Sequence, residues 1–571
     1  MISFEHSIAT AVAKTDAFSE TEVLQLLSIP QETTHGNFSL PCFALAKKMR
    51  KAPKLIAEEL ATQIQLPKEL SKVEPVNGYL NFFIDRSFLA SSVLTEIQEE
   101  GLLYGHAKPN GKTVIIDFSS PNIGKELAFH HLRSTMIGNS LSRIYKASGY
   151  HVERINHLGD WGTAFGKLIV MYLRDGGSLE EEALEALTVK ELNILYSAFS
   201  KASLENPELE NEARVVFTKL EEGDSLYRKL WTAFKKATLK ELNRIYKMMD
   251  VSFDHYTGES FFEDRIPAVL EELREKELLV KSQELDVVML DEFDLPPCLI
   301  RKSDGSTLYA TRDLAAALYR KKEFNFTKCL YVVDLGQSLH FKQVFHVLKK
   351  MGYDWHKNMH HIPFGVILQQ TEEGKWEKGK TRSGKSNLLR DVIEAAGNKI
   401  LAFIDEKNPD LENKKEIATQ IGISALTFND LKNRRTIDVK FDWDSALSFD
   451  GATGPYVQNA HVRLCSIMRK ANYTAKISDA DWGILTNDAA YELLKVLQRK
   501  SANIQKACET DEPSALAQYA LEIAEAAHRF IHQDRVLGSP EEKSRLFLVQ
   551  STQVVLENVL TLLGLFPIRQ M

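Results

Sequence analysis

The sequence predicts an α/β protein with a central parallel sheet, preceded by an α+β unit and followed by an all-α unit. Three observations support this. Residues 113–120 (TVIIDFSS) form a short apolar run typical of a buried parallel strand. A helical pattern and a second strand-like stretch (HVERINHLG, 151–159) follow, which is the order of a βαβ unit. From about residue 415 onward, nearly every segment has a helical period.

The first unit is predicted to span residues 1–108. Helical patterning over residues 40–64 is followed by an aromatic-rich, strand-like run at 76–85 (VNGYLNFFID). On that strand Tyr79, Asn81 and Phe83 share one side, a pattern that suits base stacking and core packing equally well. Residues 106–112 (HAKPNGK) combine Pro and Gly with polar residues and are predicted to form a linker.

The second unit is predicted to span residues 109–430 and the third residues 431–571. Residues from about 170 to 290 are mostly helical and charged, so they are interpreted as an insertion between two halves of one sheet-containing domain. The strand pattern returns in the stretches 298–320 and 328–352. Trp161, which lies shortly before the insertion, is predicted to be a packing residue.

Composition sets broad limits on function. The 571 residues carry 44% hydrophobic and 26% charged residues, as an ordinary globular protein does, and are too many for one core. A net charge of −7 does not indicate a nucleic-acid binder, although it does not exclude local basic surfaces. The five cysteines are far apart and form no CxxC pair, so we predict neither a disulfide framework nor a metal site. Without a signal segment or a long apolar run, we expect a cytoplasmic protein with no membrane partner.

Two segments are candidates for binding phosphate groups. Ser119, Ser120, Pro121 and Asn122 lie between a strand and a helix, where backbone N–H groups and the helix dipole favour an anion. Further donors follow at Lys125, His130, His131 and Arg133. The alternative is a helix start that is merely capped.

The second candidate is the Gly-rich run 379–385 (GKTRSGK). Six Lys or Arg and one Glu lie between residues 375 and 390. Lys380, Arg382 and Lys385 suit the stabilisation of charge on a leaving phosphate group. A solvated basic loop is the alternative.

The motifs together resemble class I arginyl-tRNA synthetases over essentially the whole chain. The similar blocks stand in the family's order: THGNFSLPCFALAKK (34–48), SSPNIGK (119–125), HLRSTMIGN (131–139), INHLGDWGTAFGKLI (155–169), SDGSTLYATRDLAAA (303–317) and SFDGATGPYVQNAHVRLCSI (448–467). This resemblance implies a Rossmann-type catalytic domain, an N-terminal additional tRNA-binding domain and a helical anticodon-binding domain. It implies L-arginine, ATP with Mg²⁺ and tRNA(Arg) as substrates, a monomer, and a first step that requires tRNA.

The resemblance also implies roles for single residues. For the arginine substrate these residues are Asp117, Ser119, Asn122, Tyr309, Asp313 and Gln337, with Tyr309 and Asp313 at the guanidinium group. The alternative for Asp313 is an acidic residue favoured at a helix N-terminus. For ATP the matching positions are Pro121, Lys125, His131, Gly159 and Asp160, and for tRNA they are Tyr79, Asn81, Phe83, Gln458, His461 and Arg463. A solvated helix face explains the last three equally well.

One family signature is altered. Class I synthetases carry His-x-Gly-His where this chain has Ala128-Phe129-His130-His131. Loss of the first histidine removes a donor, typically worth about 2.7–4 kcal/mol in the transition state. An imidazole in place of glycine also fills space that the adenine uses, unless the backbone shifts. Either His130 replaces the lost donor, or the chain binds tRNA without charging it; we favour the enzyme because the other motifs remain.

Overall fold

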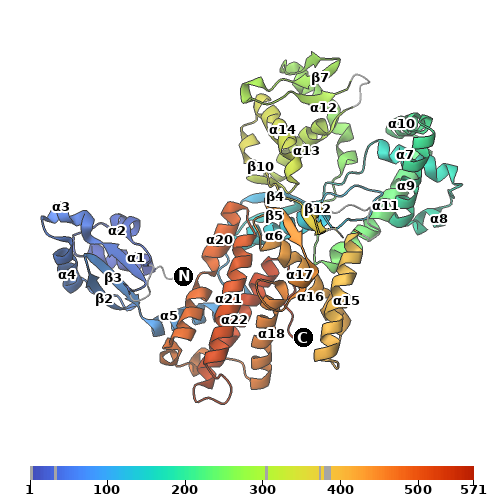
Figure 1. Cartoon of the computed structure of the whole chain (residues 1–571). Coiled ribbons are helices and arrows are strands. Elements are labelled where there is room, and N and C mark those ends of the chain that lie inside the picture. Colours follow the sequence, from blue (N-terminus) through green and yellow to red (C-terminus); the bar gives the residue numbers. More distant parts are fainter. Residues whose placement is uncertain (1–3, 31–34, 303–306, 372–373, 379–386) are drawn as a thin grey trace.

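The computed structural model describes residues 4–30, 35–302, 307–371, 374–378 and 387–571 (Figure 1). At its centre lies a four-stranded parallel sheet in the order β10-β9-β4-β5. The strands are β4 (Thr113–Asp117), β5 (His151–Ile155), β9 (Lys328–Tyr331) and β10 (Met359–His361). Ile115 in β4 pairs with Glu153 in β5 and Cys329 in β9, and it is fully buried. The predicted parallel sheet is therefore confirmed.

Helices cover this sheet. α6 (His131–Ala147) connects β4 to β5 and is buried along most of its length. α13 (Tyr309–Phe324) precedes β9, and α14 (Ser338–Lys350) follows it. Along the chain β4 leads to β5 on one side, whereas β9 lies on the other side of β4 and leads to β10. The loops after β4 and β9 consequently diverge and leave a crevice at the carboxyl ends of these two strands.

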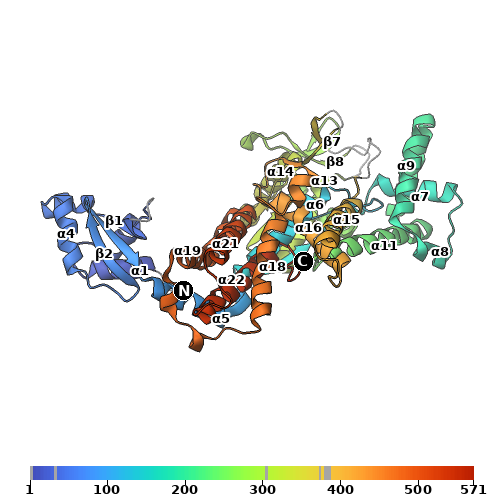
Figure 2. The same ribbon diagram turned by 60° about the horizontal axis from the view of Figure 1, so that its bottom comes forward.

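The predicted insertion is a helical arm, at the right of Figures 1 and 2. Trp161 is a packing residue, as predicted, because its ring lies edge-on to Phe217 and Trp231. The arm consists of α7 (Thr163–Arg174), α8 (Glu181–Ala186), α9 (Val189–Glu205), α10 (Glu208–Glu221) and α11 (Ser225–Met248). A 3-10 turn (Glu259–Arg265) and α12 (Ile266–Glu275) then lead to the antiparallel strands β6 (Val280–Ser282), β7 (Leu285–Val288) and β8 (Cys298–Arg301).

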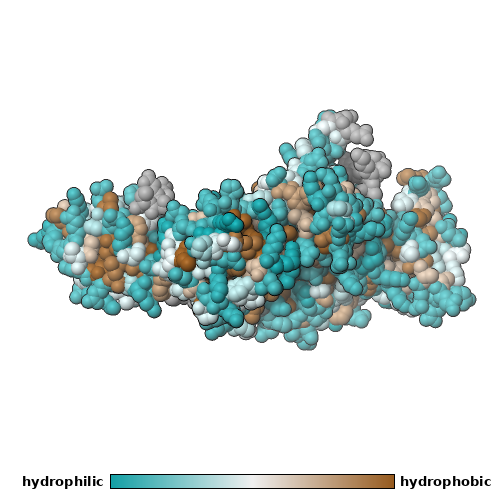
Figure 3. Space-filling model, turned by 90° about the horizontal axis from the view of Figure 1, so that it is seen from below, coloured by the Kyte–Doolittle hydropathy of each residue, from teal (hydrophilic) through white to brown (hydrophobic). Residues whose placement is uncertain are grey.

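The N-terminal unit is a separate lobe, at the left of Figures 1 and 2. An antiparallel sheet of β1 (Phe38–Pro41), β3 (Tyr79–Ile84) and β2 (Leu70–Val76) is accompanied by α1 (Phe4–Ala13), α2 (Glu20–Leu26), α3 (Ala46–Met49) and α4 (Pro53–Gln63). In Figure 3 a group of hydrophobic side chains marks the surface of this lobe. Much of the predicted 40–64 helix is instead split between β1, a 3-10 turn, α3 and α4.

Helix α5 (Arg86–Glu100) belongs in space to the C-terminal helices, although we predicted a unit boundary at residue 108. Arg86 donates to the Thr486 carbonyl and pairs with Asp488. The apolar face of α5, which includes Leu89, Val93 and Ile97, is buried. A buried face needs a partner, and here distant residues supply it.

The C-terminal unit is all-helical, as predicted. Its helices are α17 (Trp443–Leu447), α18 (Gly454–Ala471), α19 (Asp488–Gln498), α20 (Lys500–Thr510), α21 (Ser514–Gln533) and α22 (Glu542–Leu562), and α15 (Leu389–Lys407) and α16 (Lys414–Leu431) precede them in the chain. A small sheet consists of β12 (Trp376–Lys378) and β11 (Ile367–Gln370), which precede α15, and β13 (Val439–Phe441), which lies between α16 and α17. β13 pairs with β11, so the central unit continues past the predicted boundary at 430. Within the described part of the chain, no helix joins the length and apolar composition needed to cross a bilayer.

Candidate active site

A cavity of about 180 Å³ opens at the carboxyl ends of β4 and β9. Ligands of open parallel sheets bind at this kind of place. Its walls are the loop after β4, the start of α6, the residues after β9, the run into β11 and the end of β12. The lining residues are Ser119, Ser120, His130, His131, Arg133, Ser134, Val332, Val333, Asp334, Phe364, Gly365, Val366, Ile367 and Lys378.

The backbone after β4 is held in an unusual conformation. Ser119 and Ser120 have φ angles of 70° and 45°, in the left-handed region that non-glycine residues rarely adopt. Such residues cost on the order of 1–3 kcal/mol each and persist only where the surroundings hold them. Here the Ser119 N–H donates to Ser134 Oγ (2.9 Å), and the Ser120 hydroxyl donates to Asp117 (2.9 Å). The strained turn therefore shapes one wall of the cavity.

The helix α6 begins later than its sequence pattern predicts, at His131. Residues 118–130 form a long loop, so Lys125 is not in the first helical turn. Its Nζ lies 4.5 Å from the ring centre of Tyr196 in the insertion, and Lys125 is absent from the cavity lining. Arg133 touches the cavity but is only 1% exposed and pairs with Asp430. Of the four donors predicted here, only the two histidines offer accessible groups at the cavity.

The two histidines have distinct surroundings. The Ala128 N–H donates to Nδ1 of His131 (2.9 Å), so we assign the ring proton of His131 to Nε2. Burial lowers the pKa of His131 to about 4, with a further contribution from His130. Burial also lowers the pKa of His130, as does nearby Lys378. Both rings are therefore neutral near pH 7 and each can donate one hydrogen bond.

His130 borders the cavity and does not fill it. Its backbone is right-handed helical (φ −65°, ψ −23°), and its ring centre lies 4.1 Å from that of His131. An imidazole at this position is thus accommodated without backbone strain. His130 therefore offers a hydrogen-bond donor at the cavity wall.

The altered signature is physically joined to the basic run. The Phe129 N–H donates to the Asn387 carbonyl, and the Leu389 N–H donates to the Leu127 carbonyl, both at 2.8 Å. Lys378, directly before the run, lines the cavity. Lys380, Arg382 and Lys385 lie outside the described residues. The sequence counted Lys378 among the cations but did not single it out, and it also missed Asp334.

Gly159 packs against the loop after β4. Its N–H donates to the Pro121 carbonyl (3.1 Å), and its carbonyl accepts from Ile123 (3.0 Å). A Cβ at Gly159 would lie 2.1 Å from Asn122 Oδ1, so a larger residue there requires the Asn122 side chain to move. Pro121 and Gly159 are therefore close together, as expected of one site, while Asn122 remains exposed.

Two predicted ligand carboxylates already have partners within the chain, and their direct contact with a substrate stays a prediction. Asp117 accepts from the Arg320 guanidinium at 2.7 Å, and both side chains are buried. Asp160 is 0% exposed and accepts from the Ser260 N–H and hydroxyl, with Lys235 Nζ 2.5 Å away. Buried acids keep their charge only when paired, and the tertiary structure supplies these partners.

The predicted arginine-binding side chains lie on one edge of α13 and at the start of α14. Tyr309 is the first residue of α13 and is 67% exposed, and Asp313 follows one turn later. Asp313 lies 2.5 Å from His340 Nε2. Burial acts to raise the pKa of Asp313, but the bond to His340 outweighs it and the pKa lies below its usual value. Gln337 is exposed just before α14.

Glu259 is an acidic neighbour that sequence reasoning missed. It is 8% exposed, and burial raises its pKa to about 8 against the opposing charge of Arg312. The charges of Asp313, Asp160 and Glu263 reinforce the rise, so several carboxylates surround this position. The only sequence signal for Glu259 is the charge-rich block ESFFEDR (259–265).

Three of the residues predicted to contact RNA are buried, and their contact with RNA stays a prediction. Asn81 is 3% exposed and accepts from the Ser39 hydroxyl. Gln458 and His461 are 0% exposed and bind the carbonyls of Phe566 and Ile568 in the C-terminal segment. A helical or strand period cannot show which polar residue another segment covers. Tyr79, Phe83 and Arg463 keep exposed or partly exposed side chains.

Comparisons with known proteins agree with this architecture. Residues 93–443 match the family described as tRNA synthetases class I (R), catalytic domain. Residues 457–571 match the DALR anticodon binding domain, and residues 3–84 match the arginyl tRNA synthetase N terminal domain.

Similar proteins cover the whole chain. The arginine–tRNA ligase of Alkaliphilus metalliredigens is 45% identical over 96% of each chain. That of Clostridioides difficile is 44% identical over 97% of this chain and 96% of its own. The arginyl-tRNA synthetase structure from Plasmodium falciparum aligns with a TM-score of 0.77 at 25% identity, covering 99% of this chain and 98% of its own. With a matching catalytic domain and relatives of this identity along its full length, the chain belongs to the class I arginyl-tRNA synthetases.

Proposed function

We propose that this protein forms arginyl-adenylate from L-arginine and ATP and transfers the arginyl group to the 3′-terminal ribose of tRNA(Arg). In the first step an arginine carboxylate oxygen attacks the α-phosphorus of ATP, and pyrophosphate leaves. In the second step a ribose hydroxyl attacks the carbonyl carbon of the adenylate, and AMP leaves. The cavity at β4 and β9 is the observation that most supports this, because His130 borders it and leaves it open.

His131 and Lys378 are proposed to contact the ATP phosphates, because both line the cavity. His130 is proposed to replace the donor that Ala128 lacks. Lys380, Arg382 and Lys385 follow Lys378 directly in sequence and are proposed to assist with pyrophosphate. Lys125 can take part only if it leaves Tyr196.

The guanidinium of arginine is proposed to bind between Asp313 and Glu259, with Tyr309 beside it. Paired carboxylates match the fork of a guanidinium group. Ser119, Asn122 and Gln337 are proposed for the other end of the amino acid. Tyr79, Phe83 and Arg463 remain proposed tRNA contacts. We further propose that Mg²⁺ enters with ATP, that tRNA is required for the first step, and that the protein acts as a cytoplasmic monomer.

Charging of tRNA(Arg) with labelled arginine tests the enzymatic function. We expect the wild type to charge tRNA, and His130→Gly to lower kcat by a factor of about 10²–10³, as loss of one transition-state donor does. His151→Ala is the matched control, because His151 is an exposed histidine outside the cavity and bonds Glu153.

The alternative is a protein that binds tRNA without charging it, and the missing histidine at Ala128 is the observation that favours it. No charging by the wild type, together with charging by His130→Gly, would overturn the enzymatic proposal. That result would mean that the His130 side chain blocks the position of the ATP adenine.

A further inference from the structure

The helix α6 contacts different parts of the protein at its two ends. His131, its first residue, lines the cavity. Arg143 lies twelve residues later, about 18 Å along the helix at the usual rise of 1.5 Å per residue. Because α6 is one continuous helix, a displacement at Arg143 can be transmitted to His131.

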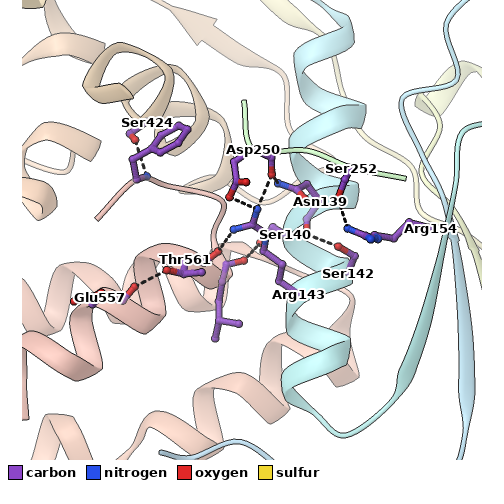
Figure 4. A network of polar contacts seen from close by, with 12 residues as sticks. Asn139, Ser140, Ser142, Arg143, Arg154, Asp250, Ser252, Ser424, Glu557 and Thr561 are labelled. Atoms are coloured by element: carbon purple, nitrogen blue, oxygen red, sulfur yellow. Dashed lines mark hydrogen bonds and ion pairs between the residues drawn. The ribbon is translucent and has the colours of Figure 1, made fainter. Parts of the chain in front are cut away.

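Arg143 binds the C-terminal ends of two other helices (Figure 4). It donates to the Thr561 carbonyl in the last turn of α22 (2.7 Å). The same guanidinium donates to the Asp250 carbonyl (2.6 Å) and carboxylate (2.8 Å), just after the end of α11. Helix ends carry unsatisfied carbonyls and partial negative charge, so one cation stabilises both ends and joins them.

The end of α22 is closely seated on α6. The Ser140 hydroxyl donates to the Leu562 carbonyl (3.0 Å). Gly564 has a φ of 75°, and a Cβ there would lie 3.0 Å from Met136 Cε and 3.1 Å from Asn139 Nδ2. Glycine allows the chain to cross α6 at this distance. A displacement of the end of α22 would therefore directly change its contacts with α6, including those of Arg143.

α11 connects the Arg143–Asp250 contact to the cavity wall. Tyr246 lies one turn before Asp250, and its hydroxyl is 2.7 Å from Ser119 Oγ. Thr135 uses its single hydroxyl proton on the His131 carbonyl, so it must accept from Ser119. Ser119 then has no proton left for Tyr246, and the Tyr246 hydroxyl must be the donor to Ser119. Tyr246 in turn accepts from Asn156 (3.1 Å).

We propose that Arg143 is a positioning residue that links the seating of α22 to the strained turn at Ser119 through α11 and Tyr246. The proposal rests on the proposed function and names a coupling route within it. α22 lies in the segment that matches an anticodon-binding domain, so tRNA bound there would set the geometry of the cavity wall.

Three variants test this. Arg143→Lys keeps the charge, but one ammonium cannot span both the Thr561 and Asp250 acceptors as the guanidinium fork does. Tyr246→Phe removes the hydroxyl that donates to Ser119 and accepts from Asn156. Arg154→Lys is the matched control, because Arg154 makes a similar forked contact with Asp254 and Ser252 and, among the described residues, forms no hydrogen bond with α22.

Two readouts are needed. The first is charging of full-length tRNA(Arg) and of an acceptor-stem minihelix without an anticodon. The second is amide hydrogen exchange of residues 118–124 with and without tRNA, which does not depend on activity. If the wild type fails to charge tRNA, the proposed function fails while the exchange measurement still decides the coupling.

We expect tRNA to protect residues 118–124 in the wild type and in Arg154→Lys, but not in Arg143→Lys or Tyr246→Phe. With full-length tRNA, kcat should fall about tenfold in each of the latter two variants, within the range of typical coupling energies. KM for tRNA and charging of the minihelix should stay within about twofold, and the double variant should lose no more than either single one.

A merely structural role for Arg143 predicts a different result. Equal loss on both RNAs in Arg143→Lys, additive losses in the double variant, or unchanged protection of residues 118–124 would each overturn the proposal.

Discussion

Glu259 illustrates how the burial of one side chain prepares a site for a cation. Its pKa is raised to about 8, so in the free protein at pH 7 it is mostly protonated. A bound guanidinium favours the ionised form, so arginine binding should release a proton below pH 8. Affinity for arginine should therefore rise between pH 6 and 8 and level off above that.

Glu259→Gln should remove this pH dependence and weaken arginine binding by about 2–4 kcal/mol, the usual loss for a truncated buried charge pair. Calorimetric titration at several pH values, in two buffers of different ionisation enthalpy, measures both quantities. Glu263→Gln is the control, since Glu263 is already bonded to Arg312. A slope in Glu259→Gln equal to that of the wild type would contradict the assignment.

Lys500 is a buried cation that lowers stability. It is 0% exposed, and no described residue accepts a hydrogen bond from its Nζ, which lies 5.7 Å from the Tyr104 ring centre. Burial lowers its pKa to about 7. The unfolded chain binds this proton up to about pH 10.4, so between pH 7 and 10.4 the unfolded state holds more protons and stability rises with pH.

Lys500→Met should raise the free energy of unfolding at pH 7 by roughly 2–4 kcal/mol, because it keeps the apolar stem and removes the desolvated amine. Urea unfolding at pH 7 and pH 10 checks this, and the gain should be smaller at pH 10. A loss of stability at pH 7 would show that Lys500 has a partner worth more than its burial.

At the scale of elements, α6 and α16 are joined by one buried ion pair. Arg133 Nε lies 2.7 Å from Asp430 Oδ1, and the side chains are 1% and 3% exposed. Arg133 also donates to the Ile437 and Arg435 carbonyls. Burial raises the pKa of Asp430 to about 6, although Arg133 acts to lower it.

Arg133→Ala should destabilise the protein by about 3–5 kcal/mol at pH 8, because it leaves a buried charge without a partner. The loss should be smaller at pH 5. Without Arg133 the folded pKa of Asp430 rises further above its unfolded value, so stability falls as pH rises toward that folded pKa. Thermal unfolding at both pH values measures this, with Arg274→Ala, which breaks an exposed pair with Glu271, as the control. Equal losses at both pH values would contradict the role given to Asp430.

At the scale of the whole molecule, the N-terminal lobe stands apart from the body (Figures 1 and 2). Its buried apolar side chains include Ile8, Leu40, Leu80 and Phe82. A bond from Asn37 Nδ2 to the Tyr491 hydroxyl is one of its contacts with the C-terminal helices. Lobes with a core of their own fold largely independently.

Deleting residues 1–84, which retains α5, should leave the main unfolding transition within about 3 °C, since few buried groups are exposed. KM for tRNA should rise while KM for arginine stays unchanged. Differential scanning calorimetry and steady-state charging test this. A collapse of the main transition would show that the lobe is part of the structural core.

The sequence by itself determined the central sheet, the three kinds of unit and the family. TVIIDF, the helical periods and the ordered motifs are local patterns, and burial on both faces of a parallel strand imposes an apolar run wherever the strand lies. It also predicted that His130 and His131 lie near the loop after that strand, and both line the cavity there, because a strand followed by a helix brings its loop to the sheet edge.

The tertiary structure decided which polar residues remain free. Asp117 and Asp160 were predicted ligands, yet Arg320 lies 203 positions from Asp117, and Lys235 lies 75 positions from Asp160. Gln458 and His461 hold a C-terminal segment more than a hundred residues away. Glu259 and Lys378 likewise became candidate site residues only because of the distant segments that lie beside them. A polar side chain acts as ligand or as internal partner according to what packs beside it, and contacts between distant segments are not written in any local period.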